Sequence, residues 1–91
     1  MNTLSWRYTI CLVVKIGERT FSRRIKRGCR PRIGDLYVLI HNEQSPFQCL
    51  HAHVCEERTD EDGAYIATFN LRETPTLTDL LENASHWQRL E

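Results

Sequence analysis

The stretch WRYTICLVVKIGERTFSRRIKR, residues 6–27, carries the strongest structural signal in the chain. Its first part alternates, with an aromatic or aliphatic side chain at every even position from Trp6 to Ile16. The odd positions are mixed and include Arg7 and Lys15. A period of two with many β-branched residues is typical of a β-strand that turns one face to the core. We therefore predict a strand over residues 6–16.

A tight turn follows at residues 17–18, where Gly-Glu separates two strand-like runs. Glycine at the first central position suits a type II′ hairpin turn, which predicts a second strand over 19–26. The resulting register places Phe21 and Ile25 opposite apolar residues of the first strand. It also places Arg23 on that apolar face, so its guanidinium must reach an edge or find a carboxylate.

Polar turns and short apolar runs alternate along the remaining chain. Residues 28–35 contain a proline and two glycines and are predicted to form a loop. Helical spacing of leucines, ending at Trp87, predicts an amphipathic helix with Thr76 at its N-terminal cap. The further elements that we predict are strands at 36–41, 47–57 and 64–71 and a helix at 77–89.

The third and fourth predicted strands are apolar enough to pair in a defined parity. Even positions paired with even positions align Leu36, Val38 and Ile40 with Leu50, Ala52 and Val54. A slip of one residue would move every one of these side chains to the opposite face. We therefore predict that the two strands pair with this parity.

These elements predict a mainly β (α+β) fold. Strands that follow one another usually lie side by side, which favours a five-stranded antiparallel meander or small half-open barrel with one C-terminal amphipathic helix. A chain of 91 residues is expected to form a single domain over residues 1–91. Its hydrophobic content of 41% and charged content of 26% are typical of soluble globular proteins.

The cellular setting is predicted from what the chain lacks. No apolar run reaches the ~18 residues that a membrane span needs, and the start of the chain is a poor signal peptide. The four cysteines contain no C-x-x-C pair, and without an export signal we expect reduced thiols and a cytoplasmic protein. These cysteines are Cys11, Cys29, Cys49 and Cys55.

The net charge of zero hides a division along the chain. Residues 1–34 hold nine basic residues and one acidic residue, whereas residues 35–91 hold three basic and eleven acidic residues. Such a division favours an acidic partner for the basic part. It is equally compatible with two interleaved halves whose fields cancel.

The basic residues cluster on the flank of the predicted hairpin and in the loop that follows it. A nucleic-acid backbone or an acidic protein surface is the expected partner, since phosphate binding needs little beyond clustered positive charge. No aromatic residue lies between Ser22 and Gly34, so we expect contact with the backbone and no stacking on bases. A solvated charged edge is the alternative. The predicted contact residues are Arg24, Lys26, Arg27, Arg30 and Arg32.

The run CLHAHVC, residues 49–55, puts cysteine and histidine at alternate positions of a predicted strand. Such residues are zinc ligands, but the run spans ~20 Å when extended and cannot wrap around one ion. A neighbouring pair, His51 and His53, is the most that one metal could share, with further ligands from Cys11, Cys29 or Asp35. We expect no metal here, and His51 with His53 is the runner-up.

A small binding or regulatory module is therefore the predicted function. No glycine-rich phosphate loop, nucleophile elbow or H-E-x-x-H motif is present, so we do not expect an enzyme or a cofactor. The first alternative is a structural protein that forms homodimers through complementary charged faces. The second alternative is a zinc-binding protein that uses His51 and His53.

Overall fold

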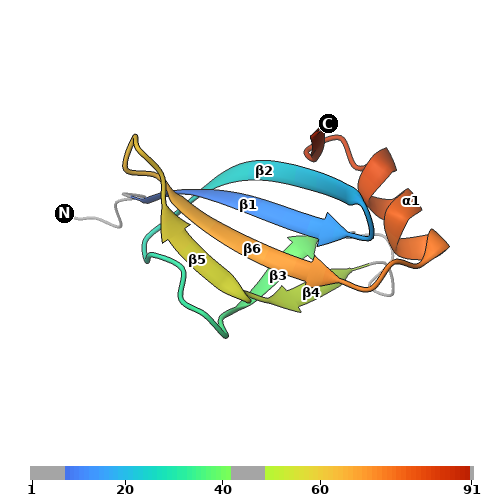
Figure 1. Cartoon of the computed structure of the whole chain (residues 1–91), viewed down its shortest axis with the longest axis horizontal. Helices are drawn as coiled ribbons and strands as arrows, with labels where there is room; N and C mark the ends of the chain where they lie inside the picture. The colour runs from blue at the N-terminus through green and yellow to red at the C-terminus, as the bar shows by residue number, and fades with distance from the viewer. Residues whose placement is uncertain (1–7, 42–48, 91) are drawn as a thin grey trace.

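Two β-sheets and one short helix form the fold in the computed structural model, which describes residues 8–41 and 49–90 (Figure 1). A five-stranded sheet has the order β5-β6-β1-β2-β7, and β3 pairs with β4 in a second, two-stranded sheet. The predicted mainly β class with a C-terminal helix is confirmed. The elements are β1 (Tyr8–Ile16), β2 (Arg19–Arg27), β3 (Leu36–Ile40), β4 (Leu50–His53), β5 (Glu56–Thr59), β6 (Tyr65–Leu71), α1 (Pro75–Asn83) and β7 (Gln88–Leu90).

The β1–β2 hairpin has the predicted register. Val14 pairs with Phe21. Ile10 pairs with Ile25. Gly17 has a φ of 60°, the left-handed conformation that the first central position of such a turn requires. The hairpin therefore follows directly from the local sequence pattern.

The strand order differs from the predicted meander. β6 lies parallel to β1 on the side away from β2, and β7 adds to the far edge of β2. The sheet is therefore mixed and does not close into a barrel. A parallel pair needs a long connection, and residues 17–64 provide it between β1 and β6. The pairing continues the apolar face of the sheet, because Leu12 lies beside Ala67 and Val14 beside Phe69.

The predicted register of the β3–β4 hairpin holds for Ile40, which pairs with Leu50, and is wrong by one residue on the other side of the irregularity. Leu36 pairs with His53, and Val38 pairs with His51. Leu36 and Val38 are 59% and 46% exposed, whereas Leu39 is buried. An irregularity in the ladder between Val38 and Ile40 accompanies this change of face. β3 is apolar on both faces, so its sequence alone could not indicate which face turns inward.

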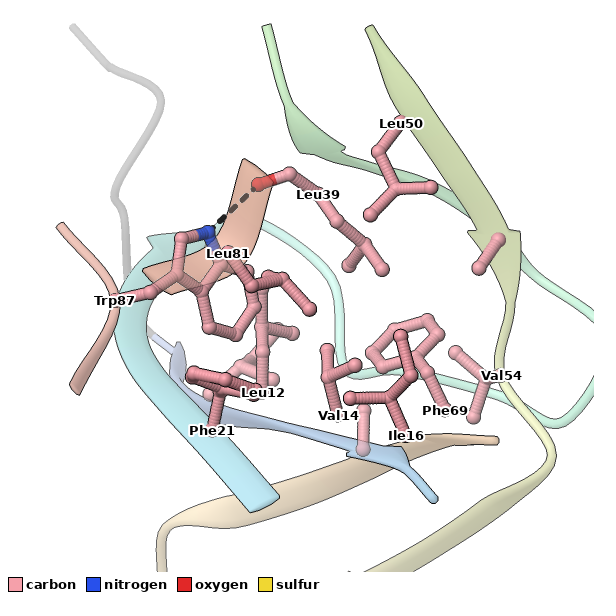
Figure 2. Packing of buried hydrophobic residues seen from close by; sticks show 13 residues of the cluster. Leu12, Val14, Ile16, Phe21, Leu39, Leu50, Val54, Phe69, Leu81 and Trp87 are labelled. Carbon is pink, nitrogen blue, oxygen red and sulfur yellow. Dashed lines mark hydrogen bonds between the residues drawn. The ribbon is translucent and has the colours of Figure 1, made fainter. Parts of the chain in front are cut away.

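Two contacts hold β3 with its odd face inward. The Tyr37 ring meets the Phe69 ring edge-on, with centroids 5.7 Å apart. The indole Nε1–H of Trp87 donates a hydrogen bond to the backbone oxygen of Leu39 at 3.0 Å (Figure 2). Both contacts join segments that are far apart in sequence, so the pattern of apolar residues within β3 and β4 could not predict them.

The C-terminal helix is shorter than predicted, since α1 spans Pro75–Asn83 and the predicted helix spanned 77–89. β6 ends at Leu71 and α1 begins at Pro75. The N-cap of α1 is Thr74 and not Thr76, because the Thr74 hydroxyl accepts a hydrogen bond from the Leu77 amide at 3.2 Å. The helix ends at Asn83, and Trp87 reaches the core from the segment that follows. That segment continues as β7 along the edge of β2. Apolar spacing thus predicted burial of Trp87 correctly but not its conformation.

The core lies between the five-stranded sheet, the β3–β4 hairpin and α1 (Figure 2). Residues from all of these elements are buried, so the core is one cluster among the described residues. The predicted fourth strand divides into β4 and β5, separated by Val54 and Cys55. Trp6, Phe47, the turn at 42–46 and Glu91 lie outside the described residues. The buried apolar residues are Ile10, Leu12, Val14, Ile16, Phe21, Leu39, Leu50, Ala52, Val54, Ala67, Phe69, Leu81 and Trp87.

Candidate anion-binding site

The loop between β2 and β3, residues 28–35, is anchored to the body of the protein. Pro31 is fully buried. The Asp35 amide donates to the Arg32 backbone oxygen, and the Asp35 carboxylate accepts from the Arg32 amide, both at 3.0 Å. The amide of Gly34, which has a φ of 95°, donates to the Val54 backbone oxygen at 2.8 Å. These bonds hold the loop in place and leave its arginine side chains exposed.

Two adjoining pockets open around this loop and share Gly28, Cys29, Arg30 and Asp35. The first has a volume of about 380 Å³ and lies between the end of β2 and the start of β3. The second has a volume of about 410 Å³ and extends to β1 and β6. We call the two pockets together the basic groove. Its other lining residues are Arg27, Leu36, Tyr37 and Val38 in the first pocket and Tyr8, Arg32 and Tyr65 in the second.

Three tyrosines line the basic groove. Tyr8 and Tyr65 meet edge to face, with ring centroids 5.7 Å apart, and Tyr37 stands in the other pocket. All three side chains are half-buried. The lack of an aromatic residue between Ser22 and Gly34 was the reason to expect no stacking on bases, and these tyrosines remove that reason. The tyrosines come from β1, β3 and β6, and only the folded sheet brings them beside the loop.

The five predicted contact residues do not form one patch. Arg27, Arg30 and Arg32 line the basic groove. Arg24 and Lys26 instead pair with Cys11 and Thr9 of β1 and so lie on the other face of the hairpin. Alternation along a β-strand separates consecutive side chains in this way.

The electrostatics of the basic groove favour an anion. Asp35 is the one acidic residue among the described residues that line it, and the Asp35 carboxylate already accepts a hydrogen bond from the Arg32 amide. Among residues 8–41 and 49–90, neither Arg30 nor Arg32 forms a salt bridge. The Arg27 guanidinium donates to the backbone oxygen of Lys26 at 3.0 Å. Positive charge in the groove is thus largely uncompensated by nearby carboxylates.

Tyr37 adds a hydrogen-bond donor to the groove. Burial raises the pKa of its phenol above the ordinary value, and the negative charge of Asp35 raises it further, partly offset by Arg27. The phenol is therefore protonated at neutral pH and can donate to a phosphate or to a base edge.

Part of the acidic half of the chain lies at the same end of the molecule. Asp62 and Arg24 line one pocket of about 290 Å³ beside the start of β1. The β5–β6 turn is held by the Asp60 carboxylate, which accepts from the amides of Asp62 and Ala64 at 2.9 Å each. The two halves of the chain are therefore interleaved in space, and the division of charge along the sequence does not separate two faces.

The histidines that are the runner-up metal ligands, His51 and His53, lie exposed on the outer face of β4. Within the described ranges, no group of three histidine, cysteine, aspartate or glutamate side chains is arranged to hold a metal ion. Cys49 instead lies with its Sγ 3.6 Å from Nδ1 of His41, a juxtaposition that sequence spacing did not predict. The Cys55 thiol donates to the Thr68 backbone oxygen at 3.1 Å.

Comparison with known proteins assigns no family: no family model, curated protein or solved structure matches the chain. No helix of residues 8–41 and 49–90 is long and apolar enough to cross a membrane. Function therefore has to be inferred from the side chains that line the pockets.

Proposed function

We propose that this chain is a binding module for single-stranded nucleic acid and that the basic groove is its contact surface. The observation that carries the proposal is the meeting of three arginines and three half-buried tyrosines around one anchored loop. Grooves of this kind bind single strands through phosphate contacts combined with aromatic platforms for the bases.

The groove offers each part of a single strand a matching surface. Arg27, Arg30 and Arg32 supply charge for the phosphates. The tyrosine rings and the exposed Leu36 side chain supply apolar area for unstacked bases. A duplex keeps its bases stacked and would leave this apolar area unused, so the groove favours a single strand. An acidic protein surface would use the arginines alone.

Fluorescence anisotropy with a labelled oligonucleotide of about a dozen nucleotides tests the proposal. Each phosphate contact contributes about 0.7 to the slope of log K against log salt for single strands, so three arginines predict a slope near −2. Arg30→Ala should weaken binding and reduce the slope by about 0.7. Arg72→Ala is the matched control, because Arg72 is equally exposed but follows β6 at the far end of the sheet.

Two outcomes contradict the whole proposal, and a third contradicts the preference for a single strand. The first is no binding at low salt, which would direct attention to acidic proteins. The second is an equal loss in the Arg30 and Arg72 variants, which would indicate general charge attraction. A preference for duplex over single strand would retain the arginine contacts but exclude the role of the tyrosines.

A further inference from the structure

A separate pocket of about 640 Å³ lies where the chain leaves α1 and joins the edge of β2. We call it the β2–β7 pocket. β7 pairs with β2 only as far as Ser22, so the edge of β2 is open beyond that residue. The segment 85–87 passes this open edge and forms one wall. None of the tyrosines or loop residues of the basic groove lines this pocket.

Two consecutive arginines reach the β2–β7 pocket from opposite faces of β2. Arg24 lies on the outer face, opposite Cys11. Arg23 lies opposite the buried Leu12, is half-buried, and lines the pocket together with Arg24. Of the two expectations for Arg23, an edge or a carboxylate partner, no carboxylate partner is found among the described residues.

The guanidinium of Arg23 has no carboxylate partner in the part of the chain that the structure describes, and neither has that of Arg24. Desolvating a cation without a counter-charge is unfavourable. An anion that enters this pocket therefore gains more binding free energy than an anion that binds a fully exposed arginine. Among residues 8–41 and 49–90, no aspartate or glutamate lines the pocket.

Further hydrogen-bonding side chains complete the chemistry of the β2–β7 pocket. The hydroxyls of Ser22 and Ser85 and the imidazole of His86 all line it, and the buried Trp87 supplies an apolar surface. Guanidinium groups and hydroxyls match the several acceptor oxygens of a phosphate group. The volume falls within the range of about 300–1,000 Å³ typical of small-molecule sites.

We propose that the β2–β7 pocket binds a small phosphorylated molecule, with its phosphate held by Arg23 and Arg24. A nucleoside monophosphate has the size and chemistry that the pocket fits. This site is distinct from the basic groove and does not depend on nucleic-acid binding there.

Calorimetric titration of the full chain with adenosine monophosphate tests the proposal. Arg23→Gln should reduce affinity about tenfold or more, because it removes charge-assisted hydrogen bonds to the phosphate. Arg23→Lys keeps the positive charge but loses the two-pronged geometry of the guanidinium. Its affinity should therefore lie between that of the parent chain and that of Arg23→Gln. Lys26→Gln is the matched control, because Lys26 lies two residues beyond Arg24 on the same face and does not line the pocket.

Inorganic phosphate provides an independent readout. In a Trp6→Phe background, Trp87 is the remaining tryptophan of the chain, and its emission should change as phosphate fills the pocket. Equal losses in the Arg23 and Lys26 variants, or no phosphate response in the parent chain, overturn the proposal. Thermal unfolding of each variant confirms that it is folded. Arg23→Gln should leave oligonucleotide binding unchanged and Arg30→Ala should leave phosphate binding unchanged, so the two proposals can fail separately.

Discussion

Replacing Trp87 with Phe should destabilise the protein by about 2–4 kcal/mol. The indole N–H donates to the Leu39 backbone oxygen at 3.0 Å, and both residues are buried. Phe has no donor, so the carbonyl is left unsatisfied in the core at a cost of about 1–3 kcal/mol. The smaller ring adds a cavity worth about 1 kcal/mol. The bond joins the segment before β7 to β3, so its loss also loosens the hairpin that covers the sheet.

Thermal and urea unfolding followed by circular dichroism measure this loss. A change of about 2 kcal/mol corresponds to a fall in Tm on the order of 8–16 °C for a domain of this size. Ile33→Ala is the control, since Ile33 is 67% exposed and surface changes stay within about 0.5 kcal/mol. A Trp87→Phe effect no larger than that of Ile33→Ala would refute the role assigned to the hydrogen bond.

Three further predictions follow from other parts of the fold. Gly17→Ala should lower the free energy of unfolding by about 1–2 kcal/mol, because φ is +60° and the new Cβ would meet the Glu73 side chain. Adding Glu73→Ala should restore only the part of this loss that comes from the steric contact, and urea unfolding measures both changes. Burial and Asp35 raise the pKa of Tyr37 in the folded state, so its contribution to stability is complete below the unfolded pKa of about 10 and declines as pH rises through the higher folded value. Tyr37→Phe should therefore flatten the loss of unfolding free energy at alkaline pH, and an unchanged profile would count against this. Sedimentation at low and physiological salt should show a monomer, whereas a salt-sensitive dimer would favour self-association through the oppositely charged segments.

Local sequence alone determined the β1–β2 hairpin. Alternation along the first strand and the turn at Gly17 specify both strands and their register, because the paired residues, out to Tyr8 and Arg27, belong to two segments that this turn joins directly. The apolar spacing near the C-terminus likewise predicted that Leu81 and Trp87 are buried. Such features depend on neighbours in the chain, which the sequence displays directly.

Tertiary structure decided the arrangement of the remaining strands. β3 is apolar on both faces, so only the contacts of Tyr37 and Leu39 with distant residues select the inward face. The parallel pairing of β1 with β6 depends on a connection of nearly fifty residues, and no local pattern encodes it.

The candidate sites show the same division. Sequence identified the basic residues, but the pleat of β2 places Arg24 and Arg27 on different faces and so divides them between two pockets. The basic groove acquires Tyr65 because β6 begins beside the start of β1. The β2–β7 pocket exists because the pairing of β2 with β7 ends at Ser22. The order of the residues showed that basic side chains are concentrated in residues 1–34. Which aromatic rings and hydroxyls accompany that charge was decided by long-range strand pairing, since each of these side chains comes from a different part of the chain.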